Sequence, residues 1–218
     1  GKVLSATVSR VADRWFVSLS VEIEHPIPIR ENQAVGGVDL GVKALATLSD
    51  GRTVEGPKAL RKNLKKLRRL SRSLSRKVKG SANRRKVKAK IARLHARISN
   101  IRKDALHKLT DDLAGTFTVI GIEDLNVKGM MANGKLARSI ADMGFHEFRR
   151  QLDYKAEMRG TRIVVADRWF PSSKTCSDCG YIMPLLPLSN MRTVSSDLLP
   201  LTLITRTPSL LNRRVIFL

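Results

Sequence analysis

Residues 58–109 constrain the fold most strongly, because they combine a helical pattern of leucines with a nearly one-sided charge. This stretch holds 21 lysines and arginines but a single acidic residue, Asp104. Apolar residues recur in it every three or four positions, which is typical of helices with one narrow apolar face. They are Leu60, Leu64, Leu67, Leu70 and Leu74, then Val87, Ile91, Leu94, Ile98, Ile101, Leu106 and Leu109. A break at Gly80, with Ser81 or Asn83 suited to cap a second helix, predicts a helical hairpin with an apolar seam and a cationic exterior.

The charge of this hairpin indicates a polyanionic partner. The whole chain of 218 residues has a formal net charge of +22. A charge run on a helix is usually a solvated face, but here almost no acids balance it, so we predict contacts with the phosphates of DNA or RNA. The predicted phosphate contacts are Lys65, Lys66, Arg68, Arg69, Arg72, Arg76, Arg84, Arg85 and Lys86. The alternative is a merely basic surface, as on a ribosome-associated protein.

The sequence on either side of this hairpin predicts strands. Residues 1–24 alternate as a β-hairpin with one solvated face, and "HPIPIRENQ" follows as a linker, because its two prolines stop both helix and ladder. Further strands are predicted at "AVGGVDLG", "KALATLSDG", "TFTVIGIEDL" and "TRIVVADR", with a short one near Arg52–Glu55. "NVKGMMANGKLARS" reads as a loop, and an amphipathic helix runs from about Ser139 to a cap at Gly160. The fold class is therefore α/β with a mixed sheet.

Two predicted strands end in a carboxylate, Asp39 and Glu123. A buried carboxylate is costly unless it is paired or coordinates a metal, and carboxylates at the ends of adjacent strands can meet at one edge of a sheet. Such oxygen ligands suit Mg²⁺ or Mn²⁺, which can activate water for phosphodiester cleavage. Acids at strand ends are also common turn residues, so that interpretation stays open. If the strand continues, the side chain of Asp124 points to the face of the sheet opposite that of Glu123. Of these two acids, we expect Glu123 to be the functional one.

Both cysteines of the chain lie in one Cys-x-x-Cys pair, Cys176 and Cys179. This spacing favours metal or redox use over a structural disulfide. Structural zinc needs four ligands, and the four histidines lie far upstream, so the pair predicts an incomplete Zn²⁺ site. The chain has no apolar run of membrane-spanning length, and we expect no membrane partner.

Three strings, "GGVDLGVKALATLSDG", "VIGIEDLNVKGM" and "ADRWFPSSKTCSDCG", resemble the TnpB (OrfB) family encoded by bacterial insertion sequences, which is similar to type V CRISPR effectors. The resemblance covers roughly residues 1–180. It implies an RNase H-like, RuvC-type mixed sheet with an inserted basic helical hairpin and half of a zinc ribbon. It also implies RNA-guided DNA cleavage in the bacterial cytoplasm, near the nucleoid, with a guide RNA from the transposon end. Asp39 and Glu123 then correspond to catalytic residues that bind Mg²⁺ or Mn²⁺.

The resemblance divides the chain into segments. Residues 1–33 correspond to the last hairpin of an N-terminal wedge domain plus a linker, 34–170 to the nuclease core with the basic hairpin at 58–113, and 171–184 to part of the zinc ribbon. Residues 185–218 form a tail outside the family pattern, which we expect to be disordered.

The composition changes after about Pro184, as a frameshift would produce. Residues 181–218 lack Gly, Ala and Lys but hold ten leucines and four of the eight prolines. A third catalytic aspartate of the family has no match here, because Asp197 lacks its context. We therefore expect a truncated chain without cleavage activity, and a non-catalytic remnant that binds nucleic acid is the alternative.

Overall fold

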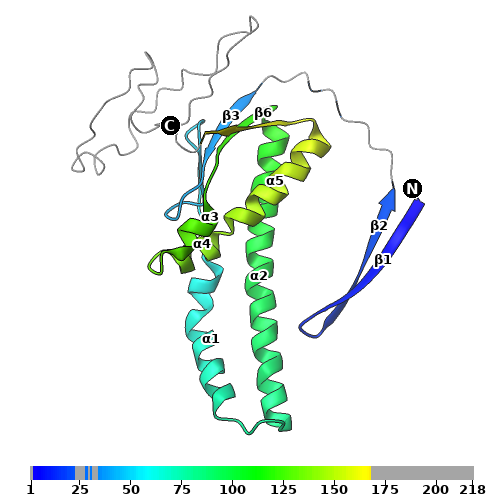
Figure 1. Ribbon diagram of the computed structural model, residues 1–218, viewed down its shortest axis with the longest axis vertical. Helices are drawn as coiled ribbons and strands as arrows, with labels where there is room; N and C mark the ends of the chain where they lie inside the picture. The colour runs from blue at the N-terminus through cyan, green and yellow to red at the C-terminus, as the bar shows by residue number, and fades with distance from the viewer. Residues whose placement is uncertain (1, 23–27, 29, 31–33, 168–218) are drawn as a thin grey trace, which may run out of the picture.

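The computed structural model describes residues 2–22, 28, 30 and 34–167 of the chain, and it contains a five-stranded mixed sheet in the order β5-β4-β3-β6-β7 (Figure 1). The strands are β3 (Val35–Asp39), β4 (Ala46–Leu48), β5 (Thr53–Val54), β6 (Val119–Glu123) and β7 (Arg162–Ala166). β3, β6 and β7 pair in parallel, whereas β4 and β5 add to the β3 side as an antiparallel extension. The prediction of a mixed α/β sheet is confirmed.

The core lies where the sheet meets α2 (Ala82–Thr116) and α5 (Phe145–Arg159). Val38 and Ile122 from the sheet join Leu113 and Phe148 from these helices in one buried cluster. Gly36 in β3 has a packing reason, because a Cβ there would lie 2.7 Å from the ring of Phe117. The aromatic ring can therefore rest directly on the strand backbone.

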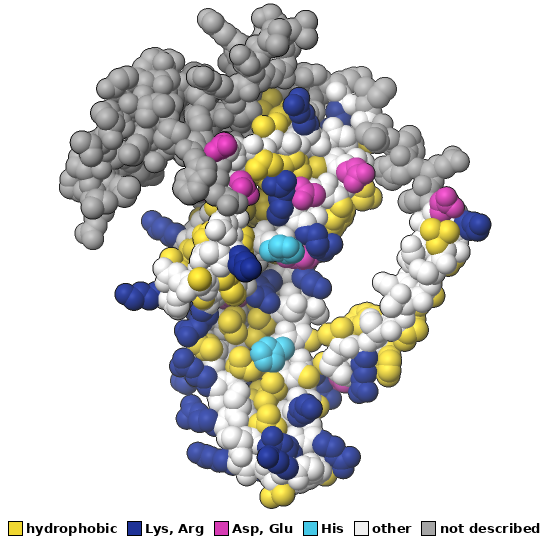
Figure 2. All heavy atoms as spheres, viewed as in Figure 1, with side chains coloured by type: hydrophobic (Ala, Val, Ile, Leu, Met, Phe, Trp, Pro, Cys, Tyr) yellow, Lys and Arg dark blue, Asp and Glu magenta, His cyan; other side chains and the backbone are white. Residues whose placement is uncertain are grey.

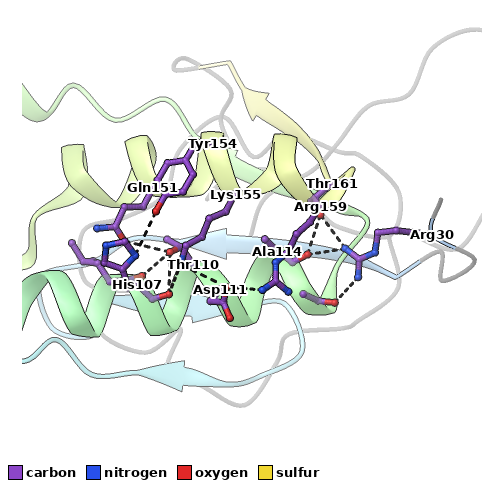
Figure 3. Close-up of polar contacts among 12 residues, drawn as sticks. Arg30, His107, Thr110, Asp111, Ala114, Gln151, Tyr154, Lys155, Arg159 and Thr161 are labelled. Carbon is purple, nitrogen blue, oxygen red and sulfur yellow. Dashed lines mark hydrogen bonds and ion pairs between the residues drawn. The ribbon is translucent and has the colours of Figure 1, made fainter. Parts of the chain in front are cut away.

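Polar contacts join the C-terminal part of α2 to Arg30, to α5 and to Thr161, which directly precedes β7 (Figure 3). The Arg30 guanidinium donates to the carbonyl oxygens of Ala114 and Phe117 at 2.7 and 2.9 Å, which serves backbone groups that a helix end leaves unpaired. Arg159 pairs with Asp111 at 2.6 Å, and Lys155 donates to the His107 carbonyl at 2.6 Å. These contacts fix the C-terminal half of α2 in the core.

The predicted helical hairpin is present. α1 (Ala59–Ser75) packs along α2, and the two helices share an apolar seam of Ala59, Leu60, Leu67, Leu70, Leu94 and Ile98. The Ser81 hydroxyl caps α2 by accepting from the Arg84 amide at 3.2 Å. We call residues 59–98 the arm, and Figure 1 shows it extending away from the sheet.

The segment between β6 and α5 differs from the prediction. The stretch predicted as a loop contains α3 (Val127–Ala132), which Asn126 caps by accepting from the Gly129 amide at 2.9 Å. The single helix predicted from Ser139 is two helices, α4 (Ala137–Met143) and α5, because Gly144 adopts a left-handed φ of 76° between them. The predicted cap at Gly160 is confirmed, with φ of 66°.

The predicted N-terminal hairpin forms from β1 (Lys2–Val11) and β2 (Arg14–Glu22). The prediction of one solvated face is wrong, because every residue of both strands is exposed. Asp13 in its turn pairs with Arg93 of α2 at 2.9 Å, and Figure 2 shows apolar side chains along the hairpin surface. None of the described helices is long and apolar enough to cross a membrane.

Candidate active site and nucleic-acid interface

Asp39 and Glu123 stand side by side at the carboxyl ends of two neighbouring strands. Each is the last residue of its strand, β3 and β6 respectively. The parallel register pairs Val38 with Ile122, so the next residue of each strand is again a neighbour. Directly paired residues present their side chains on the same face, with the strands about 4.8 Å apart. The sheet thus brings together the two carboxylates that the sequence singled out.

The environment of these carboxylates disfavours their negative charge. Burial raises the pKa of Asp39 above its usual value, although the residue as a whole is exposed at the strand end. The pKa of Glu123, which is half-buried, is also raised, first by burial and then by the negative charge of Asp39. The sequence suggested a carboxylate in a buried strand, whereas the structure shows a like-charged pair at a partly solvated edge. Such a pair is stabilised by a cation.

The donor set at this edge fits a hard divalent cation. Both side chains offer carboxylate oxygens, which Mg²⁺ and Mn²⁺ prefer, and their mutual repulsion is what a bound cation would remove. Among the residues that the structure describes, no three side chains of metal-binding type come together. Cys176, Cys179 and Asp197 lie outside the described residues.

A cationic groove runs along one face of α1. Its volume is about 870 Å³, and its lining consists of seven basic residues and one serine. They are Lys62, Lys65, Lys66, Arg69, Arg72, Ser73, Arg76 and Lys77. Those within α1 recur every three or four residues, which places them on one side of the helix, and Arg76 and Lys77 follow directly after its end. The lining extends over about 22 Å. Figure 2 shows basic side chains projecting all along the arm.

The groove contains some of the predicted phosphate contacts and adds others. Lys65, Lys66, Arg69, Arg72 and Arg76 line it, whereas Arg68, Arg85 and Lys86 do not. Two further lining residues, Lys62 and Lys77, are not among the predicted phosphate contacts, although they follow the same helical spacing.

Arg84 has a different set of partners from its neighbours. Its guanidinium donates to the carbonyl oxygens of Leu74 and Lys77, at 2.8 and 3.1 Å, at the end of α1. It therefore fastens the turn between the two helices of the arm.

The chain matches two family models. The OrfB_IS605 model, described as "Probable transposase", matches residues 18–134, which include the arm, Asp39 and Glu123. The model described as "Cas12f1-like, TNB domain" matches residues 145–198 and so runs past Pro184.

Two relatives with high sequence identity carry the same kind of name. A protein of Streptomyces pristinaespiralis named "Putative RNA-guided DNA endonuclease" is 46% identical over 88% of this chain and 48% of its own length. "Putative RNA-guided DNA endonuclease InsQ" of Escherichia coli K12 is 41% identical over 83% of this chain and 48% of its own length. The chain thus spans about half the length of these curated relatives.

A solved structure shares the fold. The structure described as "Cryo-EM structure of CRISPR-Cas12f Ternary Complex" matches 86% of this chain and 39% of its own, with a TM-score of 0.50 and 18% sequence identity. The resemblance to the TnpB family inferred from the sequence motifs is confirmed, and the chain belongs to the OrfB_IS605 (TnpB) transposase family.

Proposed function

We propose that this chain is the nuclease-core part of an RNA-guided DNA endonuclease encoded by an insertion sequence. The observation that carries the proposal is the in-register pair of Asp39 and Glu123 at the carboxyl ends of parallel strands β3 and β6. The names of the relatives support the same activity. In this proposal residues 34–170 form an RNase H-like, RuvC-type core, 58–113 are its basic insertion, and 1–33 belong to a preceding wedge domain.

The two carboxylates would hold the divalent cation, Mg²⁺ or Mn²⁺. When bound by Asp39 and Glu123, such a cation would supply Lewis-acid activation of water and of the phosphodiester. Asp39 and Glu123 contribute the negative charge that attracts it, and their partial burial strengthens that attraction by lowering the local dielectric. The chain's own part of the chemistry is therefore to position the cation at the sheet edge.

The arm would hold the nucleic acid through its phosphates. Within the described residues, none of the seven basic side chains that line the α1 groove pairs with an acid. Their charge is therefore available to a polyanion such as DNA, or a guide RNA from the transposon end. Family membership favours this partner over the ribosome-associated alternative.

We further propose that this chain alone does not cleave DNA efficiently. Two carboxylates form the described part of the site, whereas efficient phosphodiester cleavage needs the reacting groups held in a defined geometry. Residues 171–184, with Cys176 and Cys179, would form half of a zinc ribbon, and 185–218 would follow as a tail outside the nuclease core. The protein would act in the bacterial cytoplasm, where its DNA target lies.

Binding of Mn²⁺, followed by electron paramagnetic resonance of the free ion, tests this site. Each substitution removes one of the two negative charges that attract the cation, so Asp39→Asn and Glu123→Gln should each weaken Mn²⁺ binding by about tenfold or more, a loss of about 1.4 kcal/mol. The matched control is Asp153→Asn, which removes an equal charge from an exposed pair with Arg149 on α5. Equal Mn²⁺ affinity in all variants would contradict the site, and DNA cleavage that Asp39→Asn abolishes would contradict the expected inactivity.

A further inference from the structure

The base of α1 is capped by a residue from a distant helix. Lys58, directly before α1, has a left-handed φ of 48° and provides no side-chain cap. Instead, the Asp142 carboxylate on α4 accepts from the amides of Leu60 and Arg61, at 2.9 and 3.0 Å. Asp142 is only 4% exposed, so both of its oxygens are committed to the first turn of α1. A carboxylate at this end also interacts favourably with the helix dipole.

The residues on either side of Asp142 hold the same base. The Arg102 guanidinium of α2 donates to the Ala141 carbonyl oxygen at 2.5 Å. Met143 lies against Gly56, where its sulfur occupies the space that a Cβ would fill. Three consecutive residues of α4 thus contact the segment before α1, the first turn of α1 and the part of α2 just beyond the arm.

Apart from α4, few contacts determine where the base of α1 lies. α2 is one continuous helix whose C-terminal half is fixed in the core, so its direction is set. α1 packs on α2 through the narrow seam of Leu60, Leu67 and Leu70 against Leu94 and Ile98. Its far end is also tied to α2, because Arg84 donates to the carbonyl oxygens of Leu74 and Lys77. With the far end held by Arg84, so narrow a seam still allows the base of α1 to roll or shift once the hydrogen bonds to Asp142 are lost. Most cations of the groove lie on one side of α1, so such a movement would turn them away from their present direction.

We propose that Asp142 is a positioning residue that sets the roll and axial position of α1, and thereby the path of arm-bound nucleic acid relative to Asp39 and Glu123. The inference rests on the proposed function, because it assumes that the groove cations bind phosphates. Asp142 itself contacts neither the nucleic acid nor the metal. Its effect passes through two backbone amides of α1.

Binding of two DNA duplexes of different length distinguishes an effect on the position of α1 from a general loss of DNA affinity. An 8-base-pair duplex is about 27 Å long, at 3.4 Å per base pair, and matches the groove alone, whereas a 24-base-pair duplex extends beyond the base of the arm. Asp142→Asn keeps the side-chain size but loses one charged acceptor, and Asp142→Ala loses both. We expect each variant to bind the short duplex within about twofold of the original chain and the long duplex about tenfold more weakly, because a mobile α1 must be ordered on binding. Asp153→Asn is again the control of equal charge and should leave the ratio of the two affinities unchanged.

Hydrogen exchange of the Leu60 and Arg61 amides supplies a second measurement on the free protein. We expect faster exchange in both Asp142 variants and no change in Asp153→Asn. Equal weakening of both duplexes together with a lower melting temperature would show that Asp142 is merely structural, and an unchanged ratio with unchanged exchange would show that it does not hold α1; either result overturns the inference. If the original chain binds neither duplex, the proposed function fails, whereas the exchange rates still report whether Asp142 secures α1.

Discussion

Asp39 and Glu123, which lie side by side at the ends of two parallel strands, impose an electrostatic cost on the folded state. Their folded pKa values are raised, Asp39 by burial and Glu123 by burial and by Asp39. Relative to the unfolded chain, the fold therefore favours their protonated forms. The stability that this contributes is fully present below the unfolded values of 3.8 and 4.5, and it is lost as the pH rises through the raised folded values. At neutral pH and without a cation, the pair therefore lowers the free energy of unfolding.

Neutralising either carboxylate should stabilise the metal-free chain at neutral pH. We expect Asp39→Asn and Glu123→Gln to raise the melting temperature at pH 7, by about 2–4 °C for each kcal/mol of repulsion removed. At pH 3 the difference should disappear, because the carboxyl groups are then protonated in both the folded and the unfolded states. Thermal unfolding in a chelator, with Asp153→Asn as the control, measures this. A lower melting temperature for Asp39→Asn at pH 7 would contradict the raised pKa.

At the scale of single elements, the turn of the arm distinguishes two adjacent arginines. Arg84 serves the carbonyl oxygens of Leu74 and Lys77, while Arg85 is exposed. Arg84→Ala should therefore destabilise the chain by about 1–2 kcal/mol through the lost charged hydrogen bonds. Arg85→Ala should leave the melting temperature unchanged and weaken DNA binding modestly. Urea unfolding together with a DNA titration of both variants tests the distinction, and equal stability of the two would contradict it.

The start of α5 carries a pH-dependent contact. The hydrogen bond from Arg150, and then that from Gln151, lower the pKa of Glu147 to about 2, although its burial acts in the opposite direction. A lowered pKa contributes stability that is present above the unfolded value of 4.5 and is lost as the pH falls toward about 2. Glu147→Gln should therefore lower the melting temperature at pH 7, and the difference from the original chain should shrink by pH 3. A constant difference across this range would show that the carboxylate charge is not responsible.

The elements that the sequence predicted well are those with a local signal. β3 and β6 follow from apolar runs that end in an acid, and α1 and α2 follow from their leucine spacing. The break at Gly144 was missed because apolar spacing continues across it, and left-handed backbone depends on local packing as well as on residue type. α3 was missed because a six-residue helix carries too little periodicity.

In the candidate site, too, the residues with a local sequence signal were predictable, whereas the contacts that depend on the tertiary fold were not. The position of Asp39 and Glu123 at strand ends could be predicted from the sequence. That they are neighbours depends on the pairing of β3 with β6, which the sequence of either strand does not reveal. The partners of Arg84 and Asp142 depend on tertiary contacts, and Asp142 caps an amide 82 positions away in the chain. No pattern within one helix indicates such a contact.

For the molecule as a whole, the excess of +22 charges should dominate binding to nucleic acid. If six of the groove cations contact phosphates, the logarithm of the DNA affinity should fall with the logarithm of salt concentration with a slope of about −5. Fluorescence anisotropy at 50 to 200 mM salt measures this slope. An affinity that does not change over this range would rule out phosphate contacts as the main source of binding.

Charge reversal should locate these contacts on the molecule. Arg69, Arg72 and Arg76, all in the groove, changed together to Glu should weaken binding to every DNA sequence alike and flatten the salt slope by about 3. The matched control reverses Lys2, Arg14 and Arg162, which are exposed and lie outside the arm. Equal losses in the two triple variants would mean that net charge, rather than the groove, determines binding.

The arm, whose contacts are close in sequence, should also affect the rate at which the chain folds. Val35 must meet Val119, 84 positions later, before the parallel pairing of β3 and β6 can begin. Closing so long a loop is entropically unfavourable, whereas the arm forms from contacts close in sequence and shortens the span that remains open. Leu94, buried in the seam, should therefore belong to the folding nucleus, and Leu94→Ala should slow refolding more than it accelerates unfolding. The arm that we propose to bind nucleic acid would then also bring the two halves of the sheet, and with them Asp39 and Glu123, within reach of each other.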